Sequence, residues 1–167
     1  MKCGLLGEKL GHSYSPQIHG FLGSYCYELF EKQPDQLEGF LKNGNFHGIN
    51  VTIPYKKAVI PYLDELSPVA AKLGAVNTVV RRSDGSLIGH NTDYFGFLSM
   101  LKKSGFQAAG KKALVLGSGG AGITAAAVLG ELGADVVIIS RSGDNNYQNL
   151  PRHHDAALIV NATPVGM

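Results

Sequence analysis

Short apolar runs alternate with helix-like stretches along almost the whole chain. Apolar runs bounded by polar or glycine-rich turns predict strands, and apolar residues spaced three and four apart predict helices. The expected strands are Cys3–Leu6, Tyr25–Phe30, Gly48–Ile53, Val76–Val80, Leu87–Ile88, Ala113–Leu116, Val136–Ile139 and Ala157–Val160. The expected helices start at Ser15-Pro16 or cover Pro34–Lys42, Ala58–Leu73 (with Pro61 and Pro68 as breaks), Tyr94–Lys103 and Ile123–Leu132. This alternation predicts an α/β protein.

Two local signals refine this pattern. A serine before a proline favours a helix start, because the Ser15 hydroxyl can cap free amides and Pro16 suits the first helical position. The sequence Ser83-Asp84-Gly85 lies between two short apolar runs, which predicts a hairpin turn.

The second part of the chain has the order of a βαβ unit. A buried-strand run, a glycine cluster, an alanine-rich helix and another strand follow one another after Gly110, which implies a parallel sheet. We place a domain boundary near residue 100, which gives domains 1–100 and 101–167. Residues 142–156 are too few for a crossover helix with its turns, so a short helical turn or an irregular loop is expected there.

Composition and charge narrow the class of protein. The chain has 167 residues, 17% of them charged, and a net charge of +2, which favours a folded protein over a disordered one. Its paired cations are scattered without interleaved aromatic residues, so no nucleic-acid partner is expected. The two cysteines lack metal-ligand spacing, and Glu131 and Asp135 break the longest apolar stretch, so we expect no metal and no membrane span. The N-terminus lacks a signal-peptide pattern, and a cytoplasmic protein is expected.

Residues Gly117 to Gly122 form a G-x-G-x-x-G pattern between a predicted strand and a predicted helix. Glycines let the backbone turn sharply and approach a diphosphate closely, and the free amides at the helix start then bind the anion. The pattern alone also occurs in turns that serve only packing. Its position inside a βαβ unit favours a dinucleotide-binding loop.

The next predicted strand ends in Ser140-Arg141-Ser142. A site that prefers NAD usually carries an acidic residue here, which accepts hydrogen bonds from the adenosine ribose. An arginine flanked by hydroxyls suits a 2′-phosphate instead, and one charge-assisted hydrogen bond contributes about 1.5–3 kcal/mol. The sequence therefore favours NADP as cofactor.

Three polar clusters in the first part of the chain have no obvious structural role. Ser13 and Ser15 offer two hydroxyls near a helix start, enough to hold a small carboxylate, whereas simple capping would explain Ser15 alone. Asn50 and Thr52 share one face of a strand by their period-two spacing. The segment Gly89–Asp93 leads from a strand into a helix, where capping is again the alternative.

Six motifs together resemble the shikimate dehydrogenase family. In chain order they are H-S-x-S-P, N-V-T-x-P-x-K, G-A-V-N-T, N-T-D, the glycine loop and N-A-T-P-x-G-M. The resemblance runs from Gly4 to Met167. It implies an N-terminal α/β substrate-binding domain followed by a partial Rossmann-type NADP-binding domain. It further implies an oxidoreductase of aromatic amino-acid biosynthesis that interconverts shikimate and 3-dehydroshikimate with NADP(H).

The resemblance also implies roles for individual residues. Ser13 and Ser15 would hold the shikimate carboxylate, and the ring hydroxyls would be bound by Asn50, Thr52, Asn77 and Asp93. The catalytic pair would be Lys56 and Asp93. The cofactor would be bound by Gly117, Ser118, Gly119, Gly120, Ala121, Ser140, Arg141, Ser142 and Thr163.

The implied chemistry fits this catalytic pair. Oxidation of a secondary alcohol sends a hydride to the nicotinamide and a proton to a positioned side chain. Burial of Lys56 would favour its neutral form and base catalysis, whereas a close Asp93 carboxylate would favour the charged form. A charged lysine would serve as the proton donor in the reductive direction. The sequence does not decide which protonation state Lys56 has before substrate binds.

The chain departs from the family at its end. The resemblance implies further nucleotide-domain strands and a C-terminal helix beyond the position of Met167. A parallel sheet of three strands would leave one edge open, and a homodimer is one way to cover it. Three alternatives stay open: a quinate/shikimate dehydrogenase that accepts NAD, a truncated module that binds shikimate or nucleotide without turnover, and a structural fragment whose open sheet edge drives association.

Overall fold

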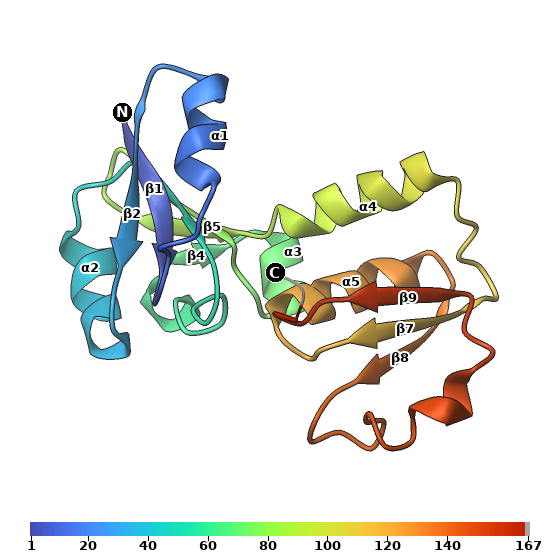
Figure 1. Cartoon of the computed structure of the whole chain (residues 1–167). Helices are drawn as coiled ribbons and strands as arrows, with labels where there is room; N and C mark the ends of the chain where they lie inside the picture. The colour runs from blue at the N-terminus through green and yellow to red at the C-terminus, as the bar shows by residue number, and fades with distance from the viewer. Residues whose placement is uncertain (166–167) are drawn as a thin grey trace. The chain divides into compact units, whose positions relative to one another are not determined.

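The computed structural model describes residues 1–165 and divides the chain into two compact units (Figure 1). The first unit is Met1–Thr92 and the second begins at Asp93. The sequence places the boundary near residue 100, a few residues later. The difference arises because the helix predicted from Tyr94 lies entirely in the second unit.

A six-stranded mixed sheet forms the centre of the first unit, in the order β2-β1-β3-β5-β6-β4. Strand β1 runs parallel to both β2 and β3, whereas β5 runs antiparallel to β3 and β6. The short strand β4 pairs parallel with β6. The strands are β1 (Lys2–Gly7), β2 (Cys26–Glu31), β3 (Gly48–Val51), β4 (Glu65–Leu66), β5 (Thr78–Arg81) and β6 (Leu87–His90).

The two faces of this sheet differ in polarity. One face is the hydrophobic core, where Leu6, Ile49 and Val79 are almost fully buried against the helices α2 (Leu37–Asn43) and α3 (Pro68–Leu73). Because side chains alternate along a strand, Asn50 and Thr78 point to the opposite face, where the register pairs them directly. Helix α1 (Ser15–Leu22) lies on this second face, on the other side of β1 and β2 from α2 (Figure 1).

The helix expected over Ala58–Leu73 is wrong for most of its length. The chain forms turns, the 3₁₀ segment η2 (Ile60–Tyr62) and β4 before α3 begins at Pro68. Pro61 and Pro68 each remove a backbone donor, so a continuous helix cannot pass them. The apolar spacing at the start of this segment instead buries Val59 in the core without a helix.

The helix start predicted at Ser15-Pro16 is confirmed, because α1 begins at Ser15. The capping role predicted for the Ser15 hydroxyl is wrong: Ser15 is already helical, and no side-chain cap is formed at Tyr14. A second Ser-Pro pair, where the sequence predicts only a break, does form a cap: the Ser67 hydroxyl accepts the Ala70 amide at 3.4 Å, and α3 ends at Gly74 in the left-handed region.

Replacing Arg81 by alanine is expected to lower the free energy of unfolding by about 2–3 kcal/mol. Its guanidinium donates to the backbone oxygens of Leu41, Gly44 and Gly85 at 2.6, 3.3 and 3.1 Å and covers an aromatic ring. The measurement is urea unfolding, with Arg82→Ala as the control. Arg82 forms an exposed ion pair with Glu65, so a loss of less than about 1 kcal/mol is expected there. Equal losses in both variants would contradict the prediction.

The second unit contains the predicted βαβ arrangement. Its three parallel strands have the order β8-β7-β9, and α5 packs on β7 and β8 with α4 beside it. The segment between β8 and β9 holds only the 3₁₀ turn η3, which confirms that no crossover helix forms there. The elements of the second unit are α4 (Asp93–Ser104), β7 (Lys112–Leu116), α5 (Gly120–Glu131), β8 (Asp135–Ile139), η3 (Leu150–His153) and β9 (Leu158–Asn161). In the first unit, the 3₁₀ segment η1 (Pro34–Gln36) precedes α2.

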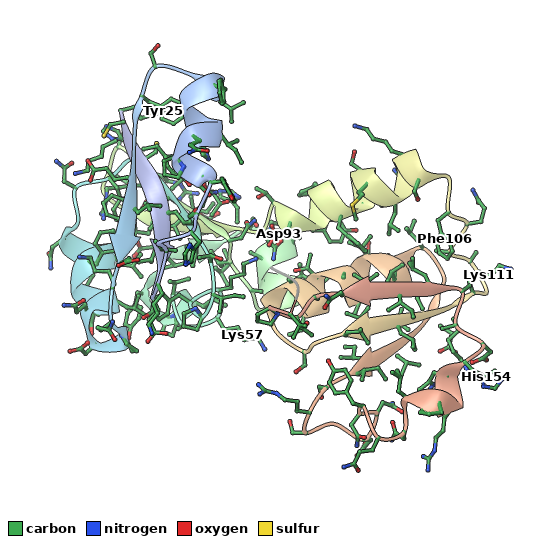
Figure 2. All side chains as sticks on the ribbon, viewed as in Figure 1. Tyr25, Lys57, Asp93, Phe106, Lys111 and His154 are labelled. Carbon is green, nitrogen blue, oxygen red and sulfur yellow. The ribbon has the colours of Figure 1, made fainter. Side chains whose placement is uncertain are left out.

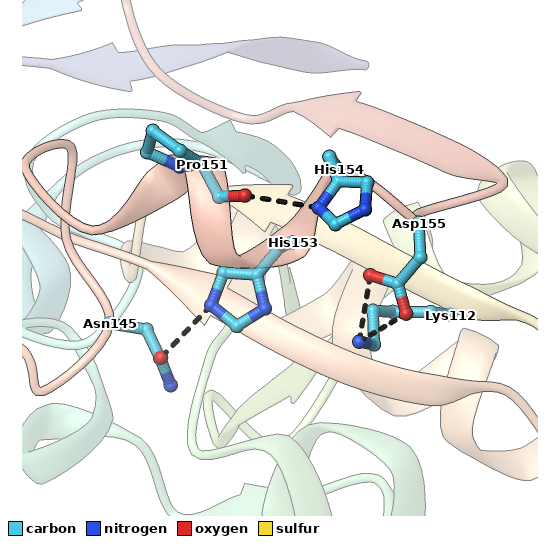
Figure 3. Close-up of polar contacts among 6 residues, drawn as sticks. All are labelled: Lys112, Asn145, Pro151, His153, His154 and Asp155. Carbon is cyan, nitrogen blue, oxygen red and sulfur yellow. Dashed lines mark hydrogen bonds and ion pairs between the residues drawn. The ribbon is translucent and has the colours of Figure 1, made fainter.

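The adjacent histidines before β9 have different partners (Figure 3). His153 Nε2 lies 3.1 Å from Asn145 Oδ1, and His154 Nδ1 lies 3.2 Å from the Pro151 oxygen. In residues 1–165, no group of three His, Cys, Asp or Glu side chains could hold a metal ion. No helix in the same range is long and apolar enough to cross a bilayer.

Candidate functional site

A row of hydrogen-bonded polar side chains crosses the second face of the six-stranded sheet. The Tyr27 hydroxyl donates to Asn50 Oδ1 at 2.7 Å, and Asn50 Nδ2 lies 3.4 Å from Thr78 Oγ1. Thr78 Oγ1 then donates to Asn77 Oδ1 at 3.2 Å. The row joins β2, β3 and β5 and includes two of the predicted site residues, Asn50 and Asn77.

Asn77 is the most firmly held member of this row and is buried. Its backbone amide donates to the His90 oxygen at 3.0 Å and its carbonyl accepts the Val51 amide at 2.7 Å. Its side chain accepts the Thr92 amide at 2.8 Å and donates to the Thr92 hydroxyl at 2.9 Å. Asn77 thereby fixes the backbone one residue before Asp93, which begins α4.

The two serines of the H-S-x-S-P motif have different roles in the structure. The Ser13 hydroxyl accepts the Ser15 amide at 3.2 Å. Burial raises the pKa of the Tyr27 phenol, and the nearby Ser15 hydroxyl lowers it. The sequence assigned the local capping role to Ser15, but the structure gives the local bond to Ser13.

Thr52 and Lys56 follow β3 in a turn. The Thr52 amide donates to the Leu6 oxygen at 2.9 Å, and its methyl group lies beside Gly7. The Lys56 carbonyl accepts the Val76 amide at 2.7 Å, so the backbone of the lysine is fixed next to the segment that carries Asn77. Lys56 is half-buried, whereas Lys57 is exposed.

Sequence reasoning missed three aromatic residues of this face. The His19 ring stacks on Tyr27 with 3.7 Å between ring centroids and 12° between planes, and His19 Nδ1 lies 2.6 Å from the Tyr25 hydroxyl. Tyr25 lies in the connection between α1 and β2 (Figure 2). Tyr27 was read only as part of an apolar strand. Its polar oxygen could have been noticed, because period-two spacing places it on the face opposite Phe30.

The glycine loop of the second unit has the geometry that its pattern predicts. Gly117 has φ +107°, and a Cβ on Gly122 would lie 2.0 Å from the Gly117 oxygen, so both positions require glycine. A Cβ on Gly119 would meet open space, and Ser118 is exposed at the loop surface. The loop opens α5, whose first-turn amides lack helical partners. This arrangement fits the close approach of a diphosphate.

The remaining predicted cofactor residues gather at the same edge of the three-stranded sheet. Parallel strands end at one edge, so the segments after β7, β8 and β9 lie there together. Arg141 and Ser142 are exposed directly after β8, and the Ser140 amide donates to the Asn145 oxygen at 3.0 Å. The Thr163 hydroxyl donates to Asn161 Oδ1 at 2.7 Å, and the Thr163 methyl lies beside Gly117.

Comparison with known proteins decides the family. Residues 5–79 match the model of the shikimate dehydrogenase substrate binding domain. A shikimate dehydrogenase (NADP(+)) of Clostridium botulinum is 38% identical over 98% of this chain and 71% of its own length. The chain belongs to the shikimate dehydrogenase family. Its N-terminal unit is the substrate-binding domain of that family, and the described part of its second unit is Rossmann-like.

Solved structures of shikimate dehydrogenases have the same fold. Shikimate dehydrogenase 1 of Peptoclostridium difficile superposes with a TM-score of 0.92 and 38% identity, over 100% of this chain and 69% of that one. The shikimate 5-dehydrogenase of Thermus thermophilus in complex with NADP(H) and shikimate gives a TM-score of 0.80 at 34% identity. That comparison covers 98% of this chain and 68% of the Thermus chain.

Proposed function

We propose that this chain is an NADP-dependent oxidoreductase that interconverts shikimate and 3-dehydroshikimate in aromatic amino-acid biosynthesis. The observation that carries the proposal is the polar row on the first unit, since Asn50 and Asn77 of two separate family motifs lie along it. A row of hydroxyl and amide groups on a folded sheet suits a small acid with several ring hydroxyls.

The carboxylate end of the substrate is assigned to the two serines. Ser13 and Ser15 are held at the start of α1 by the bond between the Ser13 hydroxyl and the Ser15 amide. Asn50, Thr52, Asn77 and Asp93 are assigned to the ring hydroxyls. The family motifs support this assignment, and the fixed backbone of Asn77 supports a rigid site, which retains more binding energy than a mobile one.

Lys56 and Asp93 are proposed as the catalytic pair. During oxidation of the alcohol, the Lys56 amine takes the hydroxyl proton, and in the reductive direction the ammonium returns it. The Asp93 carboxylate accepts a hydrogen bond from a neighbouring ring hydroxyl of the substrate and so orients the ring. The backbone at both positions is held by hydrogen bonds. The Lys56 carbonyl accepts the Val76 amide, and the Thr92 amide, one residue before Asp93, donates to Asn77 Oδ1.

The second unit is proposed to hold NADP, which supplies the hydride acceptor when bound. The diphosphate would lie against Gly117, Ser118, Gly119, Gly120 and Ala121. The adenosine end would lie against Ser140, Arg141 and Ser142, with Thr163 beside the loop. Gly122 supports the fit, because the absence of a side chain there lets the Gly117 carbonyl approach α5 closely.

The direct test is shikimate-dependent reduction of NADP by the purified chain, followed by absorbance. Quinate and NAD are assayed in parallel, because a quinate/shikimate dehydrogenase that accepts NAD is the alternative. Turnover with a preference for shikimate and NADP supports the proposal. Binding of shikimate without any turnover would instead identify a binding module.

Replacing Arg141 by alanine is expected to raise the KM for NADP at least tenfold and to leave the KM for NAD unchanged. The reason is the loss of a charge-assisted hydrogen bond to the 2′-phosphate, which is worth about 1.5–3 kcal/mol. Steady-state kinetics with both cofactors measures the effect. Arg152→Ala is the matched control, because Arg152 is an exposed arginine in η3 of the same unit. An equal rise for NADP and NAD would argue against recognition of the 2′-phosphate.

Two further expectations from the sequence remain proposals. A homodimer is tested by measuring the molar mass of the chain as a function of concentration. A cytoplasmic location is tested by fractionating cells that express it. Neither affects the assignment of the substrate site.

A further inference from the structure

The Tyr27 phenol oxygen lies between two predicted substrate ligands of different kinds. It donates its proton to Asn50 Oδ1 of β3 at 2.7 Å. Burial raises the pKa of this phenol, and the nearby Ser15 hydroxyl of α1 lowers it. Ser15 belongs to the proposed carboxylate end of the site and Asn50 to the ring-hydroxyl end. The phenol group therefore lies beside both ends.

The hydrogen bond from Tyr27 determines which way the Asn50 amide faces. A phenol has one proton, and this proton goes to Oδ1 of Asn50. The amide therefore directs its Nδ2 group away from Tyr27, where its contact with Thr78 Oγ1 is long at 3.4 Å. A ligand oxygen that approaches Asn50 thus meets an N–H donor.

The Tyr27 ring is itself held in place. The His19 imidazole stacks on it at 3.7 Å, and His19 lies one helical turn after Ser15 on the same face of α1. Burial raises the pKa of Tyr27 to about 12, so the phenol keeps its proton at neutral pH. The donor to Asn50 is therefore permanent at neutral pH.

We infer that Tyr27 is a positioning residue for substrate binding, because it fixes the Asn50 amide as a donor toward the ligand. This inference rests on the proposed function and adds a residue that the family motifs do not contain. Tyr27 acts through Asn50 and is not assigned a contact with the reacting atoms.

Tyr27→Phe is expected to raise the KM for shikimate about tenfold, because the asparagine amide loses the bond that orients it. The ring and its stack on His19 are retained, so Tm, kcat and the KM for NADP are expected to stay close to wild type. Tyr25→Phe is the matched control: it removes a neighbouring phenol that bonds His19 and belongs to no proposed substrate contact. Its KM for shikimate is expected to stay within about twofold of wild type, because the orienting bond to Asn50 is intact.

A double-mutant cycle with Asn50→Ala makes the test specific. If Tyr27 acts through Asn50, adding Tyr27→Phe to Asn50→Ala has little further effect on shikimate binding, measured by calorimetry. Full additivity of the two effects would overturn the inference, as would an unchanged KM in Tyr27→Phe. If the wild-type chain binds no shikimate, the proposed function fails and the inference fails with it. If the wild-type chain binds shikimate and Tyr27→Phe leaves the KM for shikimate unchanged, the inference about Tyr27 is refuted and the proposed function stands.

Discussion

Replacing Lys56 by alanine is expected to lower kcat for shikimate oxidation by a factor of about 10²–10⁴, while the Kd for shikimate changes little. The factor is that of removing a positioned general acid and base. The backbone contact of residue 56 with the Val76 amide does not need the side chain, so the surrounding turn is expected to persist in the variant. Steady-state assays give kcat, and calorimetry gives the Kd of shikimate.

The adjacent Lys57 provides the control for this experiment. Lys57 is exposed and carries the same charge one position later (Figure 2). Lys57→Ala is expected to keep wild-type kcat and Kd. If Lys56→Ala weakened shikimate binding and left kcat unchanged, Lys56 would be a ligand of the substrate and not its proton acceptor.

The second large effect is expected at Gly119 in the glycine loop. Gly119→Ala places a methyl group in open space at the start of α5, where the diphosphate must approach. The KM for NADP is expected to rise more than tenfold, because the backbone and the diphosphate can no longer meet closely. Since φ is −73° and ψ is −177° at this position, alanine fits the backbone and Tm is expected to stay unchanged.

Substitutions at two other glycines of α5 distinguish an effect on NADP binding from an effect on stability. A Cβ at Gly122 would lie 2.0 Å from the Gly117 oxygen, so Gly122→Ala is expected to lower Tm by overpacking, at a cost of about 1–3 kcal/mol. Gly130 is exposed with open space around it. Gly130→Ala is expected to raise Tm slightly, because alanine favours the helix, without effect on NADP. A Gly119→Ala variant with normal NADP kinetics would contradict the assignment of the loop.

The local order of the second unit could be predicted well from sequence. Strand, glycine loop and helix follow each other within Ala113–Leu132, so the contacts between them are local and the sequence pattern of this segment predicts them. The hairpin at Ser83-Asp84-Gly85 is confirmed for the same reason, with β5 and β6 antiparallel on either side. In both cases the decisive contacts are close in sequence.

The polar row could not be predicted in full, because its contacts are distant in sequence. Tyr27 reaches Asn50 across β1, and nothing in a single sequence states that β1 lies between β2 and β3. The role of Ser15 was misread because a Ser-Pro pair predicts a cap by the serine hydroxyl, whereas the structure gives the local hydrogen bond to the Ser13 hydroxyl. The two-residue strand β4 is too short to produce any periodic pattern.

The bond between Asn77 and the Thr92 amide also makes one backbone proton a natural reporter. The Thr92 N–H donates to the side chain of a proposed substrate ligand at 2.8 Å, so its exchange with deuterated solvent follows the opening of that one contact. It is the last residue of the first unit. Deuterium uptake at this single amide would therefore register occupancy of the substrate site without a cofactor, a label or turnover.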